Sequence, residues 1–245
     1  MVYFRSLIFH IFLALCLYPA LFLFSLLVIL PVPCCRWVPA WWGRKVTQSL
    51  KYIVGLKYKL TGQLPPKGQP FLLISKHQSS WETHVFPYFF PRSAFVVKRD
   101  LMWVPAYGWL LWRLGMIPIN RGKGIQSIRV MGKAARDMVS TGRSVVVFPE
   151  GTRTNPGDEV TYKSGVYFLY KTCNVPVIPI ALNSGLYWGR RSFLKKPGTI
   201  TVECLPPIPP GLEKNEFMEK LYTVIETASN RLCNEAIASK TKVVS

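Results

Sequence analysis

Residues 71–90 read FLLISKHQSSWETHVFPYFF, an apolar run followed by a polar segment and then a longer apolar pattern. The run Phe71–Ser75 has the length and branched side chains of a buried strand, and residues 81–90 have the spacing of a helix. The polar segment places His77 directly after the predicted strand. In α/β sheets, ligands and catalytic groups gather at the carboxyl ends of strands. This stretch therefore predicts an α/β fold with a functional residue in a strand-to-helix loop.

The same alternation continues along the chain. Further short apolar runs predict strands at Ala94–Val97, Met116–Ile119, Ser144–Phe148, Val175–Ala181 and Thr199–Leu205. Helical patterns lie at Trp81–Phe90, Val104–Leu114, Gly124–Thr141, Gly165–Thr172 and Lys214–Ala238. Strands that alternate with helices are typical of a mostly parallel sheet flanked by helices. We expect one α/β domain with a mixed, mostly parallel sheet over residues 61–245.

Composition excludes several classes of protein. The 245 residues carry a net charge of +19, yet 49% of them are hydrophobic. A disordered basic tail would contain far fewer hydrophobic residues. The 17 Gly have no period and there are six Cys, so neither a collagen nor a disulfide scaffold fits. No acid precedes Glu82, and Glu213–Ser245 is neutral, so the charge lies in residues 1–212. A basic, apolar chain suits a membrane surface.

An uncharged apolar run, Leu7–Pro33, lies near the N-terminus. It is long enough to span a bilayer, which needs about 20 residues. It is too long for a cleaved signal peptide, and no small-residue cleavage site follows it. Two possibilities remain: a membrane span, or a helix inserted in one leaflet and kinked at Pro19. If it spans, the bases that follow place the main domain on the cytoplasmic face of the inner (plasma) membrane.

Residues Arg36–Lys59 predict an amphipathic helix. Its apolar positions recur at helical spacing and are Val38, Trp42, Val46, Leu50 and Ile53, with Arg44, Lys45, Gln48 and Lys51 elsewhere on the wheel. Tryptophans beside a basic face fit a helix lying among lipid headgroups, and ordinary packing on a core is the alternative. We expect residues 1–60 to form membrane-embedded and interfacial helices ahead of the α/β domain.

His77 and Glu82 are the first candidates for chemistry. If the helix begins at Ser79 or Ser80, His77 lies in the entry loop and Glu82 in the first turn, so the imidazole can fold back onto the carboxylate. Such a pair can act as a general base, because the carboxylate fixes the tautomer and stabilises the imidazolium. A local alternative is open, since the segment Ser79–Glu82 also fits a capping box.

Two basic turns follow other predicted strands. Residues 149–154 read PEGTRT, in which Gly151 lets backbone N–H groups approach an anion and Arg153 can bind phosphate oxygens through its fork of donors. An ordinary surface turn is the alternative. The turn Arg121-Gly122-Lys123-Gly124 is built similarly but lacks the spacing of a P-loop, which argues against a nucleotide hydrolase.

Together these segments resemble the 1-acylglycerol-3-phosphate acyltransferases of the glycerophospholipid acyltransferase family. The family's motifs match, in order, His77-Gln-Ser-Ser-Trp-Glu82, Met116-Ile-Pro-Ile-Asn-Arg121, Phe148-Pro-Glu150-Gly151-Thr152-Arg153 and Val177-Ile-Pro179-Ile180. Lys98 and Lys163-Ser164-Gly165 also match common family positions. The departure is Glu82, because the family has Asp there. The extra methylene requires a slightly different backbone distance to His77.

The resemblance implies that residues 61–245 transfer an acyl chain from acyl-carrier protein or coenzyme A to the sn-2 hydroxyl of lysophosphatidic acid, giving phosphatidic acid. His77 would be the general base and Glu82 its orienting partner, without an acyl-enzyme. The expected phosphate-binding residues are Lys98, Arg121, Glu150, Gly151, Thr152 and Arg153. Membrane lipids are the other expected partner, and no cofactor is expected. The six Cys show no C-x-x-C spacing, so no metal is expected either.

Other functions stay open. The acceptor could be another lyso-lipid, such as lyso-ornithine lipid or a lysophosphodiester, and a non-catalytic lipid-binding module is less favoured. Charge alone suggests a nucleic-acid binder, but no RNA-binding aromatic signature or zinc finger supports one. We expect the loop of residues 188–196, which mixes aromatic and basic residues, to contact headgroups or an acidic carrier protein. A solvated basic loop is the alternative.

Overall fold

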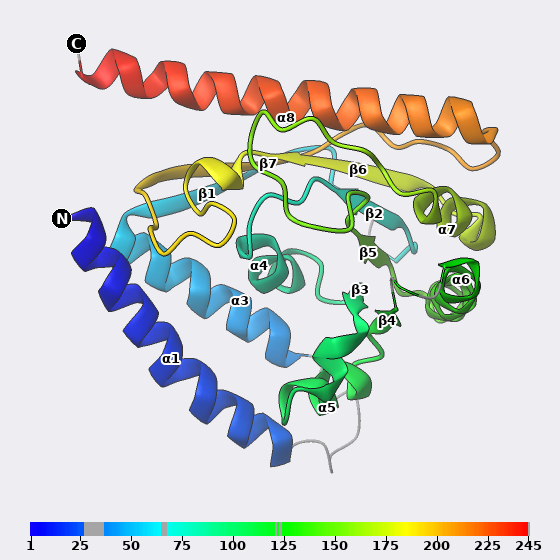
Figure 1. Ribbon diagram of the computed structural model, residues 1–245, viewed down its shortest axis with the longest axis horizontal. Coiled ribbons are helices and arrows are strands. Elements are labelled where there is room, and N and C mark those ends of the chain that lie inside the picture. Colours follow the sequence, from blue (N-terminus) through cyan, green and yellow to red (C-terminus); the bar gives the residue numbers. More distant parts are fainter. Residues whose placement is uncertain (27–36, 65–67, 121, 123, 245) are drawn as a thin grey trace.

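The computed structural model describes residues 1–26, 37–64, 68–120, 122 and 124–244, with the backbone alone for 17–26 and 240–244. Within these residues one sheet has seven strands in the order β1-β7-β6-β2-β5-β3-β4 (Figure 1). The strands are β1 (Leu56–Gly62), β2 (Leu72–Ser75), β3 (Ala94–Lys98), β4 (Ile117–Ile119), β5 (Val145–Val147), β6 (Val177–Leu182) and β7 (Gly198–Cys204). All neighbouring strands are parallel except β6 and β7. The predicted α/β fold with a mostly parallel sheet is confirmed.

Helices cover both faces of this sheet. One face packs on α6 (Gly124–Ser140), α7 (Gly165–Cys173) and the long α8 (Lys214–Val244), which runs along the top of Figure 1. The other face packs on α1 (Val2–Leu26), α3 (Trp37–Ser49) and α4 (Trp81–Phe89). Beside them lie the 3-10 turn Arg99–Trp103 and α5 (Tyr107–Arg113).

Side chains of β2 alternate between the two faces, as the pleat of a strand requires. Leu72 and Ile74 lie in the core under α6, α7 and α8, whereas Leu73 lies in the core with α1, α3 and α4. The alternation continues past the end of the strand. Lys76 contacts Glu226 on α8, whereas His77 stacks on Phe148. The pleat therefore sends two consecutive polar side chains to opposite faces of the sheet.

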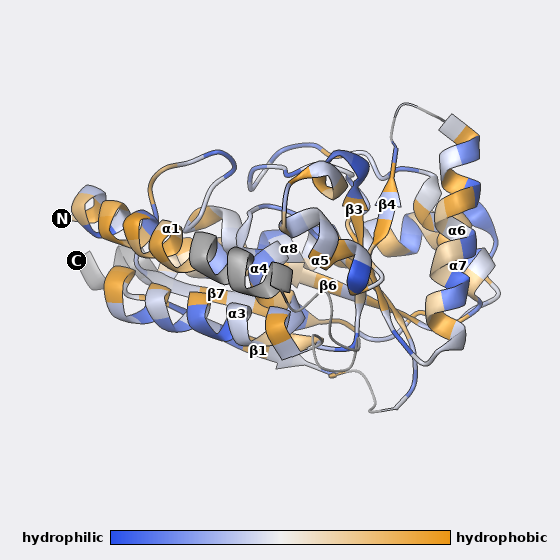
Figure 2. Cartoon of the chain, turned by 90° about the horizontal axis from the view of Figure 1, so that it is seen from below, coloured by the Kyte–Doolittle hydropathy of each residue, from blue (hydrophilic) through white to orange (hydrophobic). Residues whose placement is uncertain are grey.

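The N-terminal helices pack on the domain and also expose apolar side chains. Phe9 of α1 and Val46 of α3 are fully buried in the core cluster that includes Trp81 and Leu73. On the outer side of α1, Tyr3, Phe4 and Leu15 are each at least 66% exposed. Figure 2, which views this side, shows the hydrophobic colour along the start of α1. The helix predicted over residues 36–59 is thus partly a core helix.

The membrane-span prediction for Leu7–Pro33 falls partly outside the described residues, since 27–36 are not among them. In the part of the chain that the structure describes, no helix has both the length and the hydropathy that crossing a bilayer requires.

The end of the predicted helix Arg36–Lys59 is wrong. A π-helical turn, Leu50–Val54, closes at Gly55, whose φ of 78° lies in the left-handed region that Gly adopts easily. Strand β1 then begins at Leu56, before the domain boundary predicted at residue 61, and pairs with β7. Leu56, Tyr58 and Leu60 alternate with lysines, a period-2 pattern typical of a strand. The lysines suit an edge strand, because charged side chains there discourage pairing with other chains.

The loop at residues 188–196 is only partly available to partners. Trp188 and Lys195 are buried, and the Lys195 ammonium lies 4.7 Å from the centre of the Trp188 ring. Burial lowers the pKa of Lys195 to about 8. Its backbone N–H donates to the Ser6 hydroxyl at 2.9 Å, which ties the loop to α1. Of the aromatic and basic residues in this loop, Arg190, Arg191, Phe193 and Lys196 are exposed.

Candidate active site

His77 lies beyond the carboxyl end of β2, the strand between β6 and β5 in the sheet. Because these three strands are parallel, the segments that follow them meet at one edge. His77 follows β2, the turn of residues 149–154 follows β5, and Ser184 follows β6. The edge where the sequence placed a functional residue therefore gathers polar side chains from three separate segments.

The His77 ring faces Glu82. Its Nδ1 atom lies 3.7 Å from Glu82 Oε2, is buried, and has no hydrogen-bond partner among the described residues. The ring stacks on Phe148 with centroids 4.0 Å apart, which limits its rotation. The Nδ1–Oε2 distance is slightly longer than a hydrogen bond, and such bonds in catalytic sites commonly tighten when substrate binds. A histidine ring facing a buried carboxylate is the geometry that general-base catalysis requires.

Glu82 is fully buried and is held by hydrogen-bond donors from two segments. Its oxygens accept the backbone N–H of Ser79 at 3.0 and 3.1 Å and that of Gln78 at 3.2 Å. The Ser184 hydroxyl donates to Oε1. Glu82 also lies in the first turn of α4, where the helix dipole favours a negative charge. The capping interaction predicted for Ser79–Glu82 and the pairing with His77 are therefore both present. The same Glu82 carboxylate caps the start of α4 and faces the His77 imidazole.

Replacing Ser184 with Ala should test how firmly this carboxylate is held. The change removes a donor from a buried charged acceptor, so the free energy of unfolding should fall by about 2 kcal/mol. Urea unfolding of the purified protein measures this. Ser140→Ala, at an exposed hydroxyl on α6, is the matched control and should change the value by less than about 0.5 kcal/mol. Equal effects of the two changes would contradict the conclusion that the Ser184 hydroxyl stabilises the Glu82 carboxylate.

The turn of residues 149–154 brackets the backbone of His77. Glu150 Oε1 accepts the His77 N–H at 3.2 Å, and the Thr154 N–H donates to the His77 carbonyl at 2.9 Å. Gly151 has a left-handed φ of 68°, which allows the chain to turn between these contacts. The Arg153 guanidinium donates to the Ser80 hydroxyl, and Thr152 is exposed. This turn therefore holds the His77 backbone and brings the Arg153 cation to Ser80, at the start of α4.

Glu150 is the titratable group of this turn. Burial raises the pKa of Glu150 to about 7. The charge of Lys76 lowers this pKa in part, and the charge of Glu226 raises it by a smaller amount. Its Oε2 atom is buried and has no hydrogen-bond partner in the part of the chain that the structure describes. The contact of Glu150 with this site is the hydrogen bond that it accepts from the His77 backbone.

Two of the predicted phosphate-binding residues are not joined to this cluster by a described contact. Lys98 lies at the end of β3, is 56% exposed, and pairs with Asp100. Arg121 lies outside the described residues.

His84, which matched no motif, accepts a hydrogen bond from the Trp42 indole at 3.2 Å, and burial lowers the pKa of His84 to about 4. His84 is therefore neutral and packs as a structural residue.

Sequence reasoning missed several polar residues of the site: Lys76, Gln78, Tyr162, Ser184 and Glu226. A signal existed for two of them. Lys76 continues the alternation of Leu72 and Ile74, which places its side chain on the same buried face of the sheet as theirs. Glu226 lies between the buried Ile225 and Ala228 on α8. A charge on the buried side of an element needs a partner, and these two satisfy each other.

Comparison with known proteins adds to this geometry. The Acyltransferase family model matches residues 57–183. The chain is 34% identical over 171 residues to the 1-acyl-sn-glycerol-3-phosphate acyltransferase of Pseudomonas aeruginosa, covering 70% of this chain and 66% of that protein. It is 33% identical over 163 residues to the 1-acyl-sn-glycerol-3-phosphate acyltransferase alpha of Mus musculus, covering 64% and 57%. The matched region thus spans 66% and 57% of these two curated relatives, less than two thirds of each.

Among solved structures, the 1-acyl-sn-glycerophosphate (LPA) acyltransferase PlsC from Thermotoga maritima is similar with a TM-score of 0.72. The similarity covers 94% of this chain and 95% of that one at 20% sequence identity. It supports the fold over nearly the whole chain, well beyond residues 57–183.

Proposed function

The chain belongs to the acyltransferase family, and on that premise we propose that it moves a fatty acyl chain from a thioester to the sn-2 hydroxyl of 1-acylglycerol 3-phosphate, giving phosphatidic acid. The acyl donor is a thioester of acyl-carrier protein or coenzyme A. The observation that supports this best is the His77 ring facing Glu82, 3.7 Å away, at the carboxyl edge of the sheet.

The reaction follows from the two side chains. The second ring nitrogen of His77, Nε2, takes the proton of the acceptor hydroxyl as its oxygen attacks the thioester carbonyl. The imidazolium that forms is stabilised by Glu82, which is already fixed by its donors and need not move to do so. Collapse of the tetrahedral intermediate breaks the C–S bond, and the proton on His77 passes to the departing thiolate. No acyl-enzyme forms, so no side-chain nucleophile is required.

The acceptor phosphate has cationic partners at the same edge. Arg153, held by Ser80, lies next to the His77 loop, and Gly151 and Thr152 offer backbone and hydroxyl donors beside it. Lys98 extends the positive edge from the end of β3, which neighbours β5. We assign Arg121 to the same phosphate on the motif it completes. Glu150 supports the phosphate site indirectly through His77.

An acyl-transfer assay tests this function. Purified protein in mixed micelles would receive radiolabelled acyl-coenzyme A or acyl-carrier protein, with lysophosphatidic acid as acceptor and other lyso-lipids in parallel. Labelled phosphatidic acid as the main product supports the proposal. The second candidate acceptor class, a lysophosphodiester or lyso-ornithine lipid, is favoured instead if its product dominates. No transfer to any acceptor would contradict the catalytic function.

The lipid substrates also imply a membrane surface, for which the structure offers exposed aromatic side chains. Trp103, Trp109 and Trp112 are 78%, 57% and 68% exposed. They lie on and beside α5, which contacts α1. Tryptophan prefers the interface between hydrocarbon and water, and exposed apolar patches mark interaction sites. We propose that these residues and the outer side of α1 contact the bilayer, on its cytoplasmic face.

Changing the three tryptophans to Ser should weaken binding to anionic phospholipid vesicles by about tenfold or more, since each removes a large apolar area. Vesicle co-sedimentation measures the partition coefficient. Val130→Ser, at a residue 61% exposed on α6 of the opposite face, is the control and should bind as the wild type does. Unchanged binding of the triple variant would exclude α5 from the membrane contact.

A further inference from the structure

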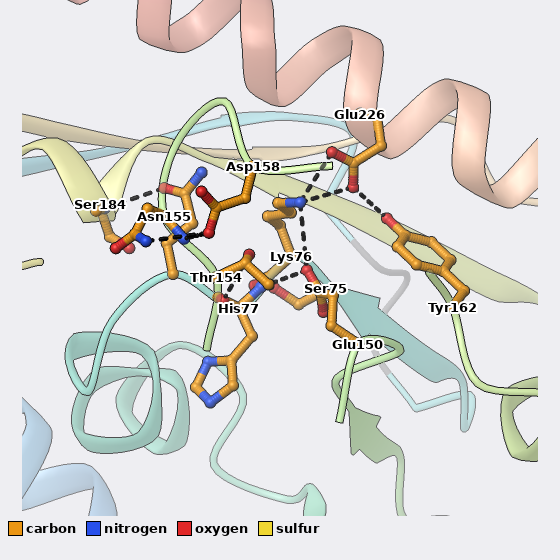
Figure 3. Close-up of polar contacts among 12 residues, drawn as sticks. Ser75, Lys76, His77, Glu150, Thr154, Asn155, Asp158, Tyr162, Ser184 and Glu226 are labelled. Atoms are coloured by element: carbon orange, nitrogen blue, oxygen red, sulfur yellow. Dashed lines mark hydrogen bonds and ion pairs between the residues drawn. The ribbon is translucent and has the colours of Figure 1, made fainter. Parts of the chain in front are cut away.

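A buried cluster of charges lies on the opposite side of the sheet from the His77 ring. Lys76 Nζ lies 2.8 Å from both carboxylate oxygens of Glu226 and 3.5 Å from Glu150 Oε1 (Figure 3). The Tyr162 hydroxyl donates to Glu226 Oε1 at 2.7 Å. The cluster thus joins the end of β2, the turn after β5, the segment before α7, and α8.

Burial makes these contacts mutually dependent. The side chains of Lys76 and Glu150 are 3% and 2% exposed, and that of Glu226 is 13% exposed. A buried ammonium without a partner is strongly unfavourable, so the position of Lys76 depends on its ion pair with Glu226. Tyr162 satisfies the same carboxylate from its other side. Lys76 is therefore held in one position, and its remaining contact is with Glu150.

The cluster is connected directly to His77. Glu150 Oε1, the oxygen that faces Lys76, also accepts the His77 backbone N–H at 3.2 Å. Lys76 is in addition the residue that precedes His77 in the chain. A shift of Lys76 or Glu150 would therefore move the His77 backbone. Glu226 lies outside residues 57–183, the part matched by the family model.

We propose that Lys76 and Glu226 are positioning residues of the acyl-transfer reaction: their ion pair anchors the His77 loop to α8 and sets the distance between His77 and Glu82. This inference rests on the proposed function. In this arrangement α8 is part of the catalytic machinery, although it contributes no group that touches the substrate.

Glu226→Gln tests the proposal with little change in shape. Gln keeps an acceptor for Tyr162 but loses the charge that holds Lys76. We expect kcat for acyl transfer to fall by about tenfold or more, because small misplacement of a catalytic group is costly, while KM for the lyso-lipid stays within twofold or threefold. Hydrogen–deuterium exchange of the peptide containing His77 should become faster. Glu219→Gln, at an exposed acid two turns earlier on α8, should leave all three quantities unchanged.

The double variant K76M/E226L separates positioning from stability. Removing one charge of the ion pair strands the other and should lower Tm clearly. Removing both should lower Tm less, although Glu150 and Tyr162 then each lose a partner. We expect the double variant to recover Tm relative to Lys76→Met and still to show the reduced kcat and the faster exchange at His77. If kcat recovers together with Tm, the pair is only structural and the proposal is overturned. Wild-type exchange and kcat in Glu226→Gln overturn it as well.

Failure of this inference is distinguishable from failure of the proposed function. A wild-type chain that transfers no acyl group to any lyso-lipid contradicts the function. In that case, faster exchange at His77 in Glu226→Gln and in the double variant would still show that the ion pair fixes the loop, and unchanged exchange would overturn the anchoring.

Discussion

Glutamine in place of His77 should lower kcat for acyl transfer by about a thousandfold, since it removes the only general base that the proposed mechanism uses. Glutamine has no group that accepts a proton near neutral pH. The backbone contacts of residue 77 with Glu150 and Thr154 do not depend on the side chain, so the loop should keep its course. KM for the lyso-lipid should therefore stay near the wild-type value, because Arg153 and its turn remain in place.

Steady-state rates of phosphatidic acid formation, with thermal unfolding to show that the variant is folded, measure this effect. His10→Gln is the matched control. The His10 ring stacks on Phe193 beside α1 and lies in none of the segments that meet at the site. It should retain wild-type kcat. Transfer by His77→Gln within a few-fold of the wild-type rate would contradict the assignment of the base.

Of the seven strands in the described residues, the sequence predicted six, because each of these is a short apolar run flanked by polar or Gly-containing turns. Strand β1 was missed for a physical reason. Its alternating lysines belong to an exposed edge, and the helical spacing of Val46 and Leu50 just before it extended the helix prediction too far. Gly55 was the available signal, because its left-handed backbone ends the helical turn there. Local pattern therefore identifies buried strands more readily than edges.

The contacts of the candidate site were likewise predictable only in part, where the residues are close in the sequence. His77 and Glu82 are five positions apart, and a strand followed by a helix was enough to bring them together. Ser184 reaches Glu82 from 102 residues away, because β6 lies beside β2 in the sheet. Lys76 and Glu226 are 150 residues apart and meet because α8 crosses that face. Strand order and helix placement are tertiary facts, so spacing along the chain could not reveal these contacts.

Glu82→Gln should lower kcat by about a hundredfold to a thousandfold, since it removes the charge that stabilises the imidazolium and also fixes the wrong tautomer. Oε1 accepts from Ser184 and from two backbone N–H groups, so a donor cannot occupy its place. The new amide NH₂ must then take the place of Oε2, which faces His77 Nδ1 and one backbone N–H. There it would donate to Nδ1 and leave the proton on Nε2, the nitrogen that must accept it.

The pH dependence separates this mechanism from simple loss of packing. Glu82→Gln should keep a low kcat at every pH between 6 and 9, since a wrong tautomer is not corrected by deprotonating the ring. Glu82→Asp is the matched variant. It keeps the charge, restores the residue type of the family motif, and withdraws the carboxylate from the ring by one methylene, so its kcat should lie between those of the wild type and Glu82→Gln. If Glu82→Gln is folded and transfers acyl groups at nearly the wild-type rate, Glu82 only caps α4, and His77 is oriented by Phe148 alone.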